Sequence, residues 1–474
     1  MTDKPDIHRI IRSQLATKAL FDQARSHAFE YMDTLHDRPV YPSPETLENL
    51  SVFDEPLPDA MGDPEKFLAL LHTYGSPATV AQTGNRYFGF VNGGVTPAAV
   101  AAKWLADVWD QNAGLFVMSP IAARLEAVCE RWLVDLFDLP ETTRAGFVSG
   151  TSTATLCGLA AARNFLLARA GWDVHQKGLN KAPELKVVLG EEAHSTVFKA
   201  LSLLGFGLDN LIRVKTDGQG RMKASDLPDL DAATLVIAQA GNVNTGAFDP
   251  FHEICGKAQK ARAWVHIDGA FGLWAQGSEN TKHLTGGIEK ADSWSVDAHK
   301  TLNAPYDCGI VLCRDESALV SALQNTGAYI QYGQNRDSML YTPEMSRRAR
   351  SVELWATLKC FGRKGIEILV DGLCGNARLF AQELEKQEFH ILNDIHFNQV
   401  LVSCGDDALT QAVLAEIKSG GVCWCGGSAW KGRSVIRISV CSWATTAQDV
   451  HMSVKAFVEA RTRALSKQTK KESK

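Results

Sequence analysis

The sequence predicts an α/β protein in which helices cover a mostly parallel β-sheet. From about residue 85 onward, short apolar runs alternate with longer amphipathic stretches such as 153–171. Six of the runs have the length and composition of buried strands, at 145–150, 185–190, 234–241, 263–270, 293–298 and 308–313. Strands that alternate with helix-length segments indicate a parallel sheet, because parallel strands need long crossover connections.

The chain changes character on either side of this region. Residues 1–85 show helical patterns broken by proline-rich turns, which predict an N-terminal helical segment. Residues 86–335 contain the six strands and form the expected large domain. Residues 336–474 begin with a long helical pattern at 346–387 and continue with further apolar runs, so we expect a small C-terminal α/β domain there.

Composition argues against several classes of protein. The 474 residues carry a formal net charge of −5, so no basic excess favours nucleic acid or a charged membrane surface. The N-terminus lacks the apolar core of a signal peptide, and no apolar run reaches the ~18 residues of a membrane span. The 11 cysteines form no CxxC pairs, which predicts reduced thiols. We expect a soluble, cytoplasmic protein that binds no metal, nucleic acid or membrane.

Lys300 follows the apolar run 293–298 directly, next to His299. Ligand-binding groups of α/β sheets lie at the carboxyl ends of strands. A lysine there is partly desolvated, which lowers its pKa and makes it a usable amine nucleophile. A surface lysine after a strand is the structural alternative, and these two residues alone do not decide between the interpretations.

Asp268 ends another apolar run and is followed by the small residues Gly269 and Ala270. An acid backed by small residues suits a flat heteroaromatic ring, because the carboxylate can keep a pyridine nitrogen protonated while the ring acts as an electron sink. An N-cap or a satisfied buried aspartate is the alternative.

Two helix starts add further groups. Gly150, Thr151 and Ser152 lie between a strand and a helix, where backbone N–H groups and hydroxyls can bind phosphate. His194 begins the next helix after a strand, where its ring can stack on a cofactor. Ordinary helix capping explains each feature separately. Together with Lys300 and Asp268, however, they supply a place for each part of pyridoxal 5'-phosphate (PLP).

The chain resembles the group II PLP-dependent amino-acid decarboxylases from about Tyr87 to Phe457. The most specific match is Asp-Ala-His-Lys at 297–300, like the family's N/D-x-H-K, followed by Tyr-Asp-Cys at 306–308. The other matching segments are YFGFVNGG near 87–94, HSTVFKA at 194–200, NVNTGAFD at 242–249, RRARSVELW at 347–355 and RISVCSWATT at 437–446.

This resemblance implies fold type I, the architecture of aspartate aminotransferase. It also implies a homodimer with shared active sites, in which residues 1–85 pack on the partner subunit. Lys300 would form the Schiff base with PLP, Asp268 would pair with the pyridine nitrogen, and His194 would stack on the ring. The other implied cofactor-binding residues are Gly150, Thr151, Ser152, Asn242, Asn244, Ala270, His299 and, toward the partner subunit's cofactor, Ser346.

The resemblance further implies a mobile-loop tyrosine that protonates the substrate carbon after CO2 leaves. Tyr329 is the best match and Tyr332 competes with it. Such a tyrosine favours decarboxylation of an L-amino acid to its amine. Transamination, aldol cleavage and decarboxylation-coupled oxidation stay open on this scaffold, as does a PLP-binding protein without turnover.

The substrate side is less specific. Phe88 and Asn92 are the expected substrate residues, and residues 112–116 of the partner subunit are expected to shape the same pocket. Asp297 stands where the family often has asparagine. A substrate carboxylate has three candidate partners, each of which suits a structural ion pair equally well: Arg86, Arg347 and Arg437.

Overall fold

The computed structural model of the protein describes residues 6–324, 332–333 and 335–472, so Tyr329 lies outside the described residues. Its larger sheet has the strand order β2-β8-β7-β6-β5-β3-β4. The strands are β2 (Arg144–Val148), β3 (Lys186–Gly190), β4 (Leu211–Val214), β5 (Thr234–Gln239), β6 (Trp264–Asp268), β7 (Ser293–Asp297) and β8 (Gly309–Cys313). Only β8 runs against its neighbours, so the predicted mostly parallel sheet is confirmed.

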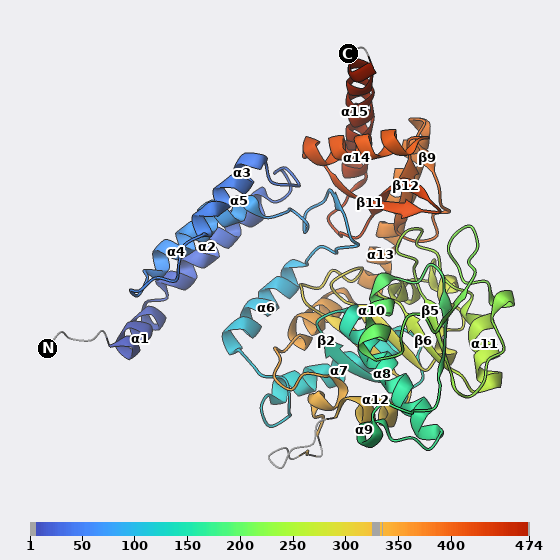
Figure 1. Ribbon diagram of the computed structural model, residues 1–474. Helices are drawn as coiled ribbons and strands as arrows, with labels where there is room; N and C mark the ends of the chain where they lie inside the picture. The colour runs from blue at the N-terminus through green and yellow to red at the C-terminus, as the bar shows by residue number, and fades with distance from the viewer. Residues whose placement is uncertain (1–5, 325–331, 334, 473–474) are drawn as a thin grey trace.

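Helices cover both faces of this sheet (Figure 1). Alternate strand residues enter two separate hydrophobic clusters: Val188 and Val236 point into one, whereas Leu189 and Leu235 point into the other. Such alternation follows from the two-residue period of a strand. The helices of this domain are α7 (Pro120–Leu136), α8 (Thr151–Arg169), α9 (Val174–Lys177), α10 (Ser195–Leu203), α11 (Phe251–Ala261) and α12 (Glu316–Leu323).

A second sheet, mainly antiparallel, has the order β1-β11-β12-β10-β9. Its strands are β1 (Tyr87–Phe88), β9 (His390–Ile391), β10 (Gln399–Ser403), β11 (Trp424–Trp430) and β12 (Arg433–Ser439), and its helices are α13 (Ser351–Lys386), α14 (Asp407–Gly420) and α15 (Ala447–Glu472). Helix α13 is interrupted at Gly362, where φ is 57°. Because β1 pairs with β11, Tyr87 and Phe88 join the C-terminal sheet although they precede the larger sheet in the chain.

The N-terminal helices stand away from both sheets (Figure 1). They are α1 (Ile7–Thr17), α2 (Ala19–Thr34), α3 (Pro44–Glu48), α4 (Pro64–Leu70) and α5 (Ser76–Ala78), and none of them contains a buried residue. A π-helical turn, Leu71–Gly75, joins α4 to α5. Helix α6 (Pro97–Trp109) then leads into the body of the molecule. Among the described helices, none is long and apolar enough to cross a membrane.

Candidate active site

A cavity of about 380 Å³ lies at the edge of the larger sheet where β2, β3, β6 and β7 have their carboxyl ends. This is the edge at which α/β proteins bind ligands, because the turns that follow the strands converge there. Most of the predicted cofactor residues contribute to its wall. The lining residues are Ser149, Gly150, Thr151, Ser152, Thr153, His194, Thr196, Ala270, Asp297, His299, Lys300 and Tyr306.

Lys300 lies in the turn after β7, and its Nζ is 3.1 Å from Oδ2 of Asp297. Backbone hydrogen bonds hold this turn: the Gly93 N–H donates to the His299 carbonyl, and the Asn303 N–H donates to the Lys300 carbonyl. A Cβ on residue 93 would lie 2.1 Å from the Lys300 carbonyl oxygen, so a glycine is required there. The lysine backbone is therefore fixed while its amine reaches the cavity.

Asp297 connects the lysine to the start of α8. Its Oδ1 accepts a 2.7 Å hydrogen bond from the Thr151 N–H and lies 3.6 Å from Nε2 of His299. Its side chain is almost fully buried, so these groups and Lys300 replace water around the carboxylate. An asparagine here would accept the same N–H but would not neutralise the lysine, and this explains how an acid fits the position.

The first turn of α8 is suited to phosphate. The N-cap residue Gly150 has no side chain with which to cap this helix, so Asp297 is the side chain that accepts an N–H of its first turn, and Oγ1 of Thr151 is buried without a hydrogen-bond partner among the described residues. A Cβ on residue 309 would lie 2.4 Å from the Gly150 backbone. The close approach of β8 to this turn therefore requires a glycine at position 309. N–H groups at a helix start together with an unpartnered buried hydroxyl fit the phosphate of PLP.

His194 and Asp268 are two buried titratable residues of the site, and the charge of each affects the pKa of the other. His194 caps α10, and its Nδ1 accepts from the Thr196 N–H, so the neutral ring carries its proton on Nε2. Burial lowers the pKa of His194, which favours this neutral form. Burial raises the pKa of Asp268, while the charges of His194 and Lys300 act in the opposite direction. A buried carboxylate of this kind needs a cationic partner, and a protonated pyridine nitrogen provides one.

Tyr306 is a cavity residue that sequence reasoning recognised only as part of a motif. Its ring stacks on His299 with centroids 4.3 Å apart, and its hydroxyl donates to Oδ1 of Asn92 at 3.0 Å. The Asn92 amide in turn donates to Oε1 of Gln82. Burial raises the pKa of Tyr306, so the phenol stays protonated. In the sequence, Tyr306 stands six residues after Lys300 and opens the Tyr-Asp-Cys segment of the family resemblance.

Phe88 does not contact the cavity, and the structure corrects its prediction as a substrate residue. The side chain is 0% exposed and packs edge-to-face on Phe380 in the hydrophobic core around the second sheet. Asn92 is partly buried and reaches the cavity through Tyr306. The two-residue strand β1 shows too little periodicity to indicate which of its side chains enters a core.

Asn242 and Asn244 are also absent from the cavity wall, because their side chains hold the turn after β5. Oδ1 of Asn242 accepts from the N–H groups of Asn244 and Thr245, and its amide donates to the Glu192 carbonyl. Oδ1 of Asn244 accepts from the Ser428 hydroxyl. These hydrogen bonds fix the two side chains in the turn, and the expected contacts of their amides with the cofactor ring stay a prediction.

The three candidate arginines differ in their partners. Arg86 pairs with Asp449 at 3.3 Å, and Arg347 pairs with Glu126 at 2.7 Å, so both are structural. Arg437, on β12, has no carboxylate partner within the described ranges, and its Nε is buried without a hydrogen bond there. Its charge lies near enough to lower the pKa of His194.

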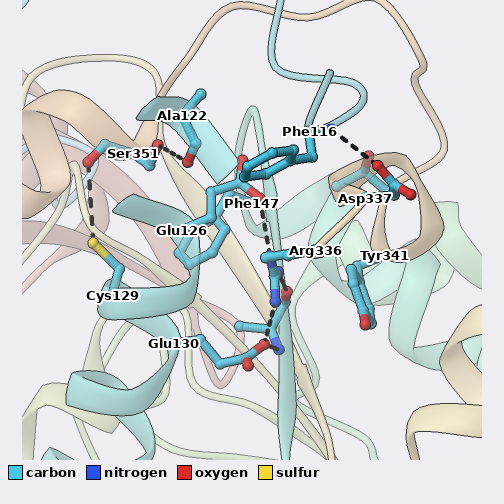
Figure 2. Close-up of polar contacts among 12 residues, drawn as sticks. Phe116, Ala122, Glu126, Cys129, Glu130, Phe147, Arg336, Asp337, Tyr341 and Ser351 are labelled. Carbon is cyan, nitrogen blue, oxygen red and sulfur yellow. Dashed lines mark hydrogen bonds and ion pairs between the residues drawn. The ribbon is translucent and has the colours of Figure 1, made fainter. Parts of the chain in front are cut away.

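A buried ion network anchors the chain just after Tyr332 (Figure 2). Arg336 pairs with Glu130 at 2.7 Å and with Glu126 at 3.4 Å. The next residue, Asp337, accepts a 2.9 Å hydrogen bond from the Phe116 N–H. The network thus ties this segment to residues 112–116, which were predicted to shape a substrate pocket.

Ser346 lies on the exposed surface, where its hydroxyl accepts a hydrogen bond from the Asn112 amide. It does not line the cavity of its own chain, and its contact with a partner subunit's cofactor stays a prediction. Tyr332 is 39% exposed and also lies outside the cavity lining.

Comparison with known proteins identifies the family. The model of the pyridoxal-dependent decarboxylase conserved domain matches residues 47–404. The acidic amino acid decarboxylase of Xenopus tropicalis is 26% identical over 81% of this chain and 74% of its own length. The aromatic-L-amino-acid decarboxylase of Bacillus atrophaeus is 28% identical over 73% of each chain.

Solved structures agree on the fold. Oryza sativa TDC, solved with PLP and tryptamine, superposes with a TM-score of 0.86 at 22% identity and covers 98% of this chain and 99% of its own. Mouse CSAD gives the same TM-score and identity over 94% and 98%. The predicted fold type I and the predicted cofactor are confirmed. The chain therefore belongs to the pyridoxal-dependent decarboxylase family, and it is a lyase that uses PLP to decarboxylate an amino acid.

Proposed function

We propose that the protein converts an L-amino acid into the corresponding amine and CO2, with PLP bound in the cavity around Lys300. The observation that carries this proposal is that the Lys300 amine and the first turn of α8 line one cavity, while the buried Asp268 carboxylate at the end of β6 lies near enough to interact with the charges of Lys300 and His194. Bound PLP supplies an electron sink for the electron pair that remains on the α-carbon when CO2 leaves.

The side chains have distinct tasks in this proposal. Lys300 holds the cofactor covalently, and Asp297 keeps the amine oriented through its 3.1 Å contact. Asp268 keeps the pyridine nitrogen protonated, because its buried charge is stabilised by a cation. The Thr151 hydroxyl, with Gly150 and Ser152, holds the phosphate. These residues orient the scissile bond and stabilise charge, which is the protein's share of catalysis.

His194, Ala270 and His299 complete the wall around the ring. The Nε2 proton of His194 offers a neutral donor at the ring face, and the small side chain of Ala270 leaves room on the other face. Nδ1 of His299 accepts a hydrogen bond from the Cys308 N–H, so Nε2 is the ring nitrogen that can contact the phosphate. In this proposal, Tyr329 returns a proton to the α-carbon, and Tyr332 is the competing candidate.

Arg437 is our candidate partner for a carboxylate of the substrate. It carries a guanidinium without an acid partner in the described part of the chain, close to His194, and burial lowers its pKa. A buried guanidinium gains from an anionic ligand, and a planar carboxylate matches its donors. The relatives do not specify which amino acid binds, since they include acidic and aromatic amino acid decarboxylases.

An Arg437→Gln variant tests this role. We expect KM to rise by about 10- to 100-fold with a smaller change in kcat, because a charge-assisted contact to bound substrate is lost. Arg433→Gln is the matched control: this arginine lies on the same strand, is exposed, and should leave KM unchanged. An equal response of the two variants would remove Arg437 from the substrate site.

The experiment that tests the function is a panel of acidic, aromatic and basic L-amino acids incubated with the holoenzyme. We expect one substrate class to release CO2 and amine in equal amounts. A keto acid without CO2 would replace the proposal with transamination, and an aldehyde formed with oxygen uptake would replace it with oxidation. Absence of any product despite bound PLP would indicate a binding protein without turnover.

We further propose that the chain acts as a cytoplasmic homodimer. Helices α1 and α2 have no buried residues and expose Ile7, Ile11, Leu15, Phe21 and Phe29. An apolar surface of this kind favours burial against another subunit. All eleven cysteines are free, as expected in a reducing compartment. Sedimentation of the full chain should give the mass of a dimer, and a stable monomer would contradict this part of the proposal.

A further inference from the structure

Two histidines and a glutamate meet in the N-terminal helical segment, away from the active site. His27 and Glu30 lie one turn apart on α2, and His72 lies in the π-helical turn Leu71–Gly75. The two imidazole rings stack with centroids 4.0 Å apart and an interplanar angle of 12°. Nε2 of His72 is 3.1 Å from Oε2 of Glu30. One potential ligand atom from each residue lies within 4.8 Å of the other two.

Hydrogen bonding leaves this cluster incomplete. Nε2 of His27 is buried and has no hydrogen-bond partner among the residues that the structure describes. A buried ring nitrogen without a partner costs free energy, so a group that binds it stabilises the fold. On His72, Nδ1 is within 3.4 Å of the Ser76 hydroxyl, which leaves Nε2 directed at Glu30. Metal-binding histidines show the same division, in which the second ring nitrogen is oriented by a neighbour.

The chemistry of the set matches Zn²⁺. Two neutral imidazoles and one carboxylate are the ligands of open tetrahedral zinc sites, in which water takes the fourth position. Bonds of about 2.0–2.2 Å to one ion bring the ligand atoms roughly 3.4 Å apart, and the two rings must turn out of their parallel stack so that their in-plane lone pairs converge on the ion. The Glu30 side chain is 66% exposed, so it can rotate to close the remaining distance.

We propose that His27, Glu30 and His72 bind Zn²⁺ and that the ion joins α2 to the turn at 71–75. The helices α1 to α5 contain no buried residue, so this segment has little core of its own to hold these elements together. An ion that binds only the folded arrangement adds its binding free energy to the stability of the segment. The sequence did not indicate this site, because His72 meets the other two ligands only after folding.

The test uses the full-length holoenzyme after removal of metal by a chelator. Calorimetric titration with ZnCl2 should give about one equivalent per chain, and Co²⁺ in place of Zn²⁺ should give the visible bands of a tetrahedral site. The variants His27→Ala and His72→Ala should weaken binding at least about tenfold. The controls His8→Ala, an exposed histidine of α1, and Cys360→Ser, an exposed thiol, should bind as the wild type does.

The same samples separate loss of a ligand from loss of folding. The visible absorption of bound PLP reports an intact body of the molecule, and His72→Gln retains a polar side chain of similar reach. Zinc should raise the unfolding temperature of the wild type and of the controls but not that of the His27 or His72 variants. The proposal fails if the wild type binds no zinc, or if the His27 and His72 variants bind zinc as tightly as the controls.

Discussion

The sheet body and the N-terminal helical segment of this chain use charged groups in opposite ways. In the body, Asp268, Asp297 and Arg336 are almost fully buried, and each is held by specific partners. In the segment, helices α1 to α5 bury no residue, and ion pairs such as Arg25–Asp22 lie in solvent. Because the charges of the body are buried, their interactions contribute strongly to stability, whereas solvent and salt screen the ion pairs of the segment. The subunit contact and the zinc ion that we propose would each add stability to this segment.

The largest effect should follow a change of charge at the cavity. Asp268→Asn keeps the shape but removes the charge that we assign to the pyridine nitrogen, so kcat/KM should fall about 10²- to 10³-fold. Steady-state kinetics at saturating PLP measures this loss. The control Glu65→Gln, in the exposed α4, should retain full activity. An Asp268→Asn variant with nearly wild-type kinetics would mean that the buried acid is structural only.

The next effect concerns the ion network of Figure 2. Arg336→Leu leaves Glu130 without its buried partner and should lower the free energy of unfolding by about 3 kcal/mol. Arg363→Leu removes an arginine that pairs with Asp135 on the surface and should cost under about 0.5 kcal/mol. Denaturant unfolding of both variants gives the comparison directly. Similar losses of unfolding free energy in the two variants would show that burial does not determine how much these ion pairs stabilise the fold.

A pH-dependent effect is expected at His266, which is completely buried beside Ser293. Burial lowers its pKa from 6.5 to about 3, so below pH 6.5 the unfolded chain binds a proton that the folded chain does not. The wild type should therefore lose stability relative to His266→Gln by up to about 1.4 kcal/mol per pH unit as the pH falls from 6.5 toward 3. Unfolding of both proteins across this range measures the difference, and parallel curves would contradict the assigned burial effect.

The smallest effect should come from the N-terminal segment. Leu15 on α1 is 56% exposed, so Leu15→Ser should change the unfolding of a single chain by less than about 0.5 kcal/mol. The same variant should weaken association of two subunits, because it removes apolar surface proposed to be buried between them. Dilution-dependent sedimentation of the wild type and variant distinguishes the two effects. A large loss of stability without any change in association would place Leu15 in a core.

The cavity wall at the strand ends could be predicted from the sequence, whereas the substrate side could not. Thr151 and Lys300 follow recognisable buried strands and Asp268 ends one, and parallel strands end at one edge of a sheet. Phe88 and Arg437 depend instead on how the second sheet packs. Phe88 lies in the core around that sheet, and Arg437 has no acid partner in the described chain. The local pattern of apolar and polar residues predicts neither result.

The role of Lys300 is tested most directly by locating the cofactor. The holoenzyme is reduced with borohydride, digested and analysed by mass spectrometry, with Lys257 and Lys359 as internal reference lysines. We predict that the added mass of reduced PLP lies on the peptide that contains Lys300 and that Lys300→Ala carries none. Stoichiometric labelling of a different lysine, or of no lysine in protein saturated with PLP, would contradict the assignment.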